Sequence, residues 1–169
     1  IVEQALIQQD DFSVIVMGQP ERAGCFCPSN TLLRNIIESI SDQFPLVIID
    51  CEAGLEQIHR SVISKIDYLL IISDASLRSI ETAKNILASA KKFSSYQEIG
   101  IILNRVKDNQ HVLLTQNIRS LDAQFLGFIP DDEKIIDLEL SGSPLRDLDT
   151  KSKSSTAAKE IFMKIIGAL

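Results

Sequence analysis

The chain alternates two patterns of apolar residues. One is a short run that is apolar at nearly every position, found at Ser13 to Met17, Leu46 to Ile49, Tyr68 to Ile72, Ile99 to Leu103 and Phe125 to Ile129. Runs of this length that are rich in branched aliphatic residues are typical of β-strands. Because they are continuously apolar, they predict strands that are covered on both faces.

The other pattern repeats apolar residues every three or four positions and predicts amphipathic helices between the runs. It is clearest at Thr31 to Ile40 and Leu77 to Phe93, and weaker at Gln110 to Leu121, Glu133 to Leu140 and Ser155 to Leu169. Ser29 or Asn30 is expected to cap the first of these helices. The apolar face of the last helix is expected to cover the sheet rather than lie on a membrane.

Regular alternation of buried strands and amphipathic helices predicts an α/β fold. The expected architecture has three layers, a mostly parallel sheet with helices on both faces. No long linker interrupts the pattern, so residues 1–169 are expected to form a single domain.

Composition narrows the range of partners. The net charge is −6, only 5% of the residues are aromatic, and Trp is absent. These features argue against nucleic acid as a partner, because binding it depends on clustered cations and stacking platforms. No apolar run reaches the length that spans a bilayer, so no membrane is expected either. An odd number of cysteines without a secretory signal indicates a cytoplasmic protein.

Polar residues that follow the predicted strands are candidates for a site, because ligands of such sheets lie beyond the carboxyl ends of the strands. They are Asp50 to Glu56, Ser73-Asp74, Asn104-Arg105 and Pro130-Asp131-Asp132. Asp50 is placed as an aspartate that holds Mg²⁺ in a nucleotide-binding sheet, and Gly54 as a glycine that lets the backbone approach a phosphate. Taken alone, these residues are better explained by ordinary turn chemistry, because aspartate is common at strand ends.

Cys25 and Cys27 are one residue apart, and two interpretations of them remain open. Both thiolates are able to bind one soft metal ion, and a symmetric dimer would complete the four ligands of a closed site. Alternatively they are small buried apolar residues, as free cysteines often are. The third cysteine, Cys51, is expected to be buried and not a ligand.

Several of these motifs together resemble one family. The run from Leu46 to Glu56 resembles the switch II segment of CooC-type ATPases, relatives of MinD and ParA with a P-loop NTPase fold. Cys25-Phe26-Cys27 is similar to the Cys-x-Cys metal motif of that family. Asn104-Arg105 and Pro130-Asp131 are similar to the adenine-side residues of MinD-like proteins.

The resemblance implies a set of functional expectations. ATP or ADP with Mg²⁺ is the expected cofactor, with Asp50 and Gly54 catalytic and Asn104, Arg105, Pro130 and Asp131 binding the nucleotide. Zinc or nickel is expected at Cys25 and Cys27, shared across a homodimer. The implied role is delivery of nickel to an enzyme such as carbon monoxide dehydrogenase.

The chain departs from this family at the phosphate-binding loop. No Gly-x-x-x-x-Gly-Lys-Ser/Thr pattern occurs in it, and its first residue is not Met. These 169 residues are therefore expected to be inactive as an ATPase and to be the C-terminal two-thirds of a domain whose loop lies upstream. The alternative is a degenerate, non-enzymatic relative that serves as a dimerisation or partner-binding module. A ParA-like partitioning protein is a third reading, disfavoured by the acidic charge and by Cys-x-Cys.

Overall fold

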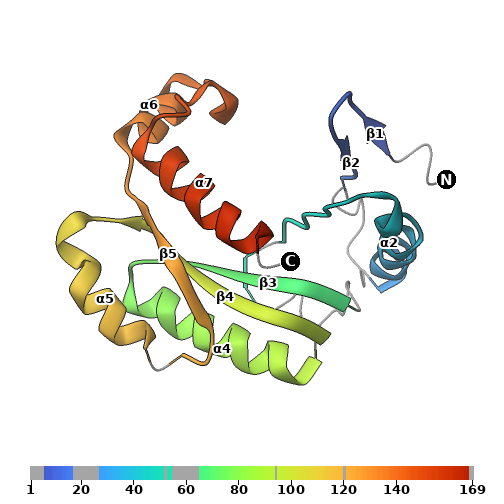
Figure 1. The fold of residues 1–169 in the computed structure, drawn as a ribbon, viewed down its shortest axis with the longest axis horizontal. Helices are drawn as coiled ribbons and strands as arrows, with labels where there is room; N and C mark the ends of the chain where they lie inside the picture. Colours follow the sequence, from blue (N-terminus) through green and yellow to red (C-terminus); the bar gives the residue numbers. More distant parts are fainter. Residues whose placement is uncertain are drawn as a thin grey trace. The chain divides into compact units, whose positions relative to one another are not determined.

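The structure is a computed structural model that describes residues 6–16, 27–51, 53–54, 65–93, 95–119 and 121–167. The chain divides into two compact units, Ile1–Ser64 and Lys65–Leu169. Each unit is described by itself, because their relative placement is not determined (Figure 1).

In the first unit, the described residues form a small hairpin and a helix. β1 (Ile7–Gln8) pairs antiparallel with β2 (Ser13–Val14), and Gln9 N donates a 2.9 Å hydrogen bond to Phe12 O in the turn between them. α2 (Cys27–Ile40) follows and ends in the short 3-10 helix η1 (Ser41–Gln43).

Three expectations for this unit are wrong. The strand predicted at Ser13 to Met17 is a two-residue antiparallel strand. Leu46 to Ile49 form no strand and are exposed, because no neighbour among the described residues supplies the ladder of backbone hydrogen bonds that a strand needs. Ser29 and Asn30 lie inside α2 rather than at its cap.

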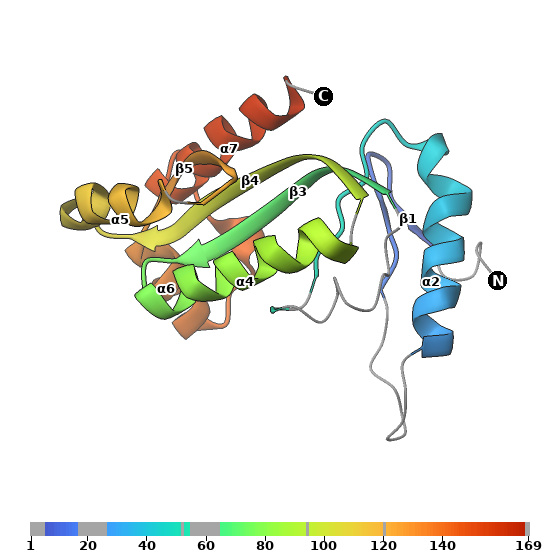
Figure 2. The ribbon, with the colours of Figure 1, turned by 90° about the horizontal axis from the view of Figure 1, so that it is seen from below.

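The second unit is built on a parallel sheet in the order β3 (Lys65–Asp74), β4 (Ser95–Val106) and β5 (Gln124–Pro130). Figure 2 shows β3 and β4 running side by side in the same direction, and the register pairs Ile71 with Ile101. All three predicted strands of this half are confirmed.

Helices α4 (Leu77–Phe93) and α5 (His111–Ile118) cover one face of this sheet (Figure 1). Alternate residues of β4 point to this face, as the period of two requires. The buried cluster beneath the helices contains Ile71, Ile80, Ala83, Leu87, Ile101, Leu103, Val106, Leu114 and Ile118.

The opposite face carries α7 (Lys153–Ile166), whose Ile161 and Ile165 pack on Ile102 and Leu126 (Figure 1). The last helix therefore covers the sheet, as its pattern predicted. Helices on both faces of a parallel sheet confirm the predicted α/β fold.

Helix α6 (Glu133–Ser141) lies between β5 and α7. Two short 3-10 helices complete the unit, η2 (Asp108–Gln110) before α5 and η3 (Leu145–Asp147) after α6. The bounds of α4 match the prediction, and those of α5, α6 and α7 differ from it by at most three residues at either end. No helix in the described ranges is both long enough and apolar enough to cross a membrane.

Candidate functional site

The three parallel strands bring the predicted site residues of the second unit to one edge. Asp74 at the end of β3 lies opposite Asn104 in β4, and Val106 lies opposite Pro130 in β5. Asp131 N donates a 3.0 Å hydrogen bond to Val106 O, which holds the start of the following loop against β4. Three segments that are distant in sequence thus share the carboxyl edge of the sheet.

An open cleft of about 450 Å³ lies at this edge. Its lining residues come from the ends of all three strands and from η2, and they are Asp74, Ala75, Ser76, Arg105, Lys107, Gln110 and Asp131. Arg105 and Asp131 were predicted as site residues, whereas Asn104 and Pro130 lie beside the cleft without lining it. Ser76, Lys107 and Gln110 were missed, because polar residues in short turns carry no motif of their own.

The carboxylate of Asp74 is fixed by the turn that starts α4. Its Oδ1 accepts a 2.7 Å hydrogen bond from Ser76 N, and Ser76 Oγ in turn accepts one of 3.1 Å from Ser79 N. Hydrogen bonds from Ser76 lower the pKa of Asp74, with smaller contributions from Ser79 and from the positive charge of Arg105. Asp74 is therefore ionised at neutral pH, and it both holds the turn that precedes α4 and lines the cleft.

Arg105 has a backbone conformation that is unusual for a residue with a side chain. Its φ is +58°, and it is the one non-glycine residue with a positive φ in the described part of the chain. Asn104 Oδ1 accepts a 2.9 Å hydrogen bond from Arg105 N and so supports this turn. Such conformations cost about 1–3 kcal/mol and cluster at functional sites.

A short turn between Lys107 and Gln110 forms one side of the cleft. Gln110 N donates to Lys107 O at 2.9 Å, and Lys107 N donates to Gln110 Oε1 at 3.1 Å. Two carboxylates and two cations line the cleft, so its formal charge is balanced. A balanced cleft favours a polar uncharged group over a polyphosphate.

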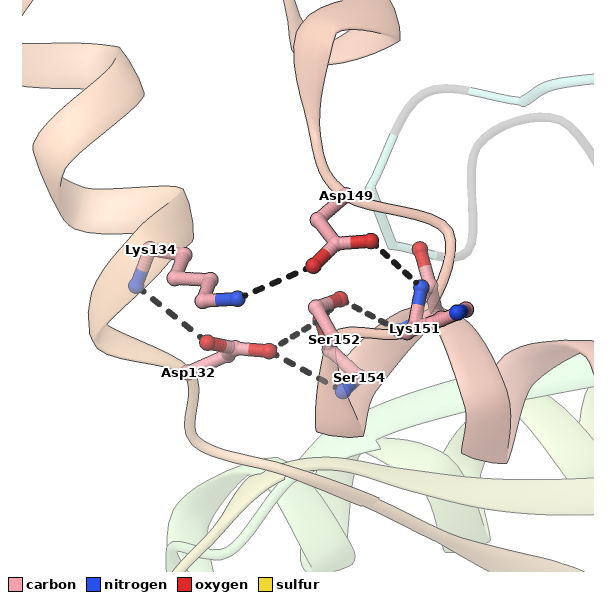
Figure 3. Close-up of polar contacts among 7 residues, drawn as sticks. Asp132, Lys134, Asp149, Lys151, Ser152 and Ser154 are labelled. Atoms are coloured by element: carbon pink, nitrogen blue, oxygen red, sulfur yellow. Dashed lines mark hydrogen bonds and ion pairs between the residues drawn. The ribbon is translucent and has the colours of Figure 1, made fainter.

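Asp132 is the next residue after Asp131 in the sequence, and its buried carboxylate joins two helices (Figure 3). Its Oδ1 accepts a 3.2 Å hydrogen bond from Lys134 N at the start of α6. Its Oδ2 accepts hydrogen bonds from Ser154 N at 3.0 Å and from Ser154 Oγ at 2.7 Å at the start of α7. Asp132 thereby anchors the loop that carries Asp131.

A second carboxylate braces the same region. Asp149 accepts hydrogen bonds from Lys134 Nζ at 3.2 Å and from Lys151 N at 2.9 Å (Figure 3). The sequence signal for the Asp132 cap is the short polar run ahead of an amphipathic helix, in which aspartate is a preferred N-cap. Its second role, at the start of α7, has no local signal because Ser154 is distant in sequence.

Asp50 and Gly54, the predicted catalytic pair, lie in the first unit. Asp50 is exposed in a segment without regular secondary structure, and Gly54 has a φ of +105°, which favours glycine. Cys51 is exposed, so the expectation that it is buried is wrong. Partial desolvation and the nearby carboxylate of Asp50 raise the pKa of the Cys51 thiol, which makes it a weak ligand at neutral pH.

The predicted metal site is outside what the structure describes. Cys25 is not among the described residues, and Cys27 is described only as the first backbone position of α2. Across the described ranges, no three His, Cys, Asp or Glu side chains form a group that could hold a metal ion.

Comparisons with known proteins agree with this architecture. The chain is 32% identical over 164 residues to an uncharacterized ATP-binding protein of Methanocaldococcus jannaschii, covering 96% of this chain and 65% of the relative. It is 28% identical over 173 residues to the carbon monoxide dehydrogenase accessory protein CooC of Rhodospirillum rubrum, covering 94% and 60%. The chain thus spans less than two-thirds of the length of both relatives.

A solved structure has the same fold. The septum site-determining protein MinD of Pyrococcus horikoshii, complexed with Mg-ADP, superposes with a TM-score of 0.70 at 18% identity, over 98% of this chain and 68% of that one. Finally, residues 7–145 match the CobQ/CobB/MinD/ParA nucleotide binding domain, and the chain therefore belongs to this family.

Proposed function

We propose that this chain is the C-terminal two-thirds of an ATP-binding domain, in which the cleft at the carboxyl edge of the sheet holds the adenine and ribose of the nucleotide. The supporting observation is the convergence of Asp74, Arg105 and Asp131 on one cleft, with Asn104 immediately beside it. Family membership gives the class of ligand.

Asn104 is suited to recognise adenine. One lone pair of its Oδ1 accepts the Arg105 N–H, which also identifies that atom as oxygen, because a backbone N–H needs an acceptor. The second lone pair and the two Nδ2 hydrogens remain for a ligand. An amide offers adenine one acceptor for its amino group and one donor for a ring nitrogen, whereas guanine presents the opposite pattern.

The charges of the cleft suit the base and the ribose of the nucleotide but not its phosphates. Arg105 is exposed and offers a planar cation that stacks on a purine, while Asp74 and Asp131 offer acceptors to ribose hydroxyls. The same carboxylates repel phosphates. The phosphates therefore require a glycine-rich loop supplied by an upstream segment, with Asp50 for Mg²⁺ and Gly54 near the terminal phosphate.

In its cellular role, the protein is a cytoplasmic ATPase that assists nickel insertion into carbon monoxide dehydrogenase. Support comes from the similarity to CooC and from the Cys25-Phe26-Cys27 motif. Two chains of a homodimer would each supply two thiolates to one zinc or nickel ion, which completes a tetrahedral site.

The alternative is a non-enzymatic module that dimerises or binds a partner without turnover. The observation in its favour is that these 169 residues contain no phosphate-binding loop pattern. Without the backbone cradle and its lysine, the developing charge of phosphoryl transfer is not neutralised.

The test is ATPase activity of the protein translated together with the upstream part of its gene. The proposal expects Mg²⁺-dependent turnover that Asp50→Ala abolishes and Asp42→Ala, an exposed carboxylate in the same unit, leaves intact. If no phosphate-binding loop is found upstream and no turnover is measured, the non-enzymatic module is the better account.

A further inference from the structure

The surface formed by α6 and η3 exposes large apolar side chains without covering any core. We call the α6–η3 surface the set Glu133, Ile136, Asp137, Leu140, Leu145 and Asp147. Within it, Leu140 is 82% exposed and Leu145 is 61% exposed. Neither α6 nor η3 contains a buried residue. Among the described residues of the second unit, packing therefore does not account for the exposed Ile136, Leu140 and Leu145.

α6 is nevertheless a well-capped helix. Asp132 caps its N-terminus, and Gly142, with a φ of +69°, ends it in a left-handed turn. In that turn Ser143 N donates to Leu138 O at 2.9 Å and Gly142 N donates to Glu139 O at 3.2 Å. Start and stop signals at both ends preform a helix in which Ile135 and Leu138 are partly buried and no residue is fully buried. A preformed helix with exposed apolar residues lowers the ordering cost of binding another molecule.

The apolar side chains of this surface are bordered by carboxylates. Ile136 and Leu140 are four residues apart and thus neighbours on one side of α6, and Glu133 and Asp137 form a second pair next to them. All four are exposed.

The charge of the region is strongly negative. Residues 131–149 contain seven carboxylates and two cations, which accounts for −5 of the net charge of −6. The two cations are already engaged, Lys134 with Asp149 and Arg146 with Asp147.

We propose that the α6–η3 surface docks a cationic amphipathic helix of a partner protein. The apolar face of such a helix would cover Ile136, Leu140 and Leu145, and its lysines or arginines would meet the surrounding carboxylates. Charge complementarity of this kind steers association and selects the partner.

The same charges disfavour two other occupants. A second copy in a symmetric dimer would place this surface against itself and bring carboxylates together. An anionic membrane would be repelled, because negative lipid headgroups attract basic segments.

The test measures binding of a fluorescent Leu- and Lys-rich amphipathic peptide, about five helical turns long, to the purified chain by anisotropy. A peptide of the same composition in scrambled order, which forms no apolar face, is the reference. Leu140→Ser, and separately Glu133→Lys with Asp137→Lys, are each expected to weaken binding of the ordered peptide by at least about tenfold. Leu77→Ser changes another highly exposed leucine, on α4, and is expected to leave peptide binding unchanged. Circular dichroism confirms that each variant is folded.

Three results would overturn the proposal. The first is equal binding of the ordered and scrambled peptides, or binding that survives Leu140→Ser. The second is a parent protein that sediments as a dimer and becomes a monomer with Leu140→Ser, which assigns the surface to a second copy. The third is binding to phosphatidylserine vesicles that Leu140→Ser removes, which assigns it to a membrane.

Discussion

Ser154 Oγ donates a 2.7 Å hydrogen bond to Oδ2 of the buried Asp132, which joins the end of β5 to the first turn of α7. The same carboxylate also receives the N–H groups of Lys134 and Ser154. One side chain thus caps two helices and holds the loop that begins with Asp131 at the cleft. This arrangement couples the stability of the C-terminal unit to the geometry of the candidate site.

The first prediction concerns this carboxylate. Asp132→Asn keeps the shape of the side chain but turns one acceptor into a donor that faces N–H or O–H groups. We expect the free energy of unfolding, measured in urea, to fall by about 1–3 kcal/mol. Asp137→Asn, an exposed position on α6, is the control and is expected to change it by less than about 0.5 kcal/mol. Equal effects of the two variants would contradict the account.

The second prediction concerns pH. Hydrogen bonds from the backbone and then the side chain of Ser154 lower the pKa of Asp132 in the folded state. A lowered folded pKa means that this carboxylate stabilises the fold above its unfolded pKa of about 3.9, and that the contribution is lost as the pH falls through the folded value.

The difference in unfolding free energy between the parent and Asp132→Asn should therefore be constant near neutral pH and shrink in acid below about pH 4. Urea titrations at a series of pH values measure it. A difference that stays constant into strong acid would show that the charge of Asp132 is not what the hydrogen bonds stabilise.

The third prediction concerns Gly127 in β5. Its φ is +154°, it lies at an irregularity of the β4–β5 register, and an added Cβ would come within 3.1 Å of Ile161 in α7. Gly127→Ala combines backbone strain with crowding, and we expect it to destabilise the chain by about 1–3 kcal/mol.

A matched pair separates the two causes. Gly142→Ala has the strain of a positive φ but open space around the new Cβ, so its cost is expected to be smaller. Adding Ile161→Val to Gly127→Ala is expected to recover part of the loss in thermal unfolding. No recovery would mean that crowding against Ile161 does not contribute.

The sequence pattern predicted the second unit well, because each of its elements has an apolar periodicity that matches the face it buries. The apolar face of Leu77–Phe93 and the continuous run of β4 each have one stable arrangement. Leu46 to Ile49 have an equally strand-like pattern, but a parallel strand exists only when neighbours pair with it. The periodicity of a segment shows which side chains it can bury, but not whether another strand pairs with it.

The candidate site was predicted in part for a similar reason. Asn104, Arg105, Pro130 and Asp131 were predicted because they directly follow apolar runs, and of these Arg105 and Asp131 line the cleft. The contacts that complete the region, Ser154 with Asp132 and Lys107 with Gln110, join polar residues whose sequence context is ordinary. Such contacts depend on the tertiary fold and not on spacing along the chain.

The fourth prediction concerns the cysteine pair. Under reducing conditions the chain is expected to bind about half a zinc ion per chain, because two chains share one four-thiolate site. Cys25→Ser or Cys27→Ser should abolish binding. Cys51→Ser should leave it intact, since that exposed thiol has a raised pKa. Elemental analysis that finds one tightly held ion per monomer, or none, would exclude the shared site.

The central claim is that the cleft at the carboxyl edge of the sheet holds the base of an adenine nucleotide. The most direct test is a nuclear magnetic resonance titration of the isotope-labelled chain with Mg-ADP and, in parallel, with Mg-GDP. Because the phosphate cradle is absent from these residues, binding is expected to be weak, which suits this measurement. The account predicts that ADP shifts the amide resonances of Ser76, Arg105, Lys107 and Asp131, that GDP shifts them less, and that Asn104→Ala removes the difference. Equal shifts with both nucleotides, or ADP-induced shifts that avoid these residues, would contradict it.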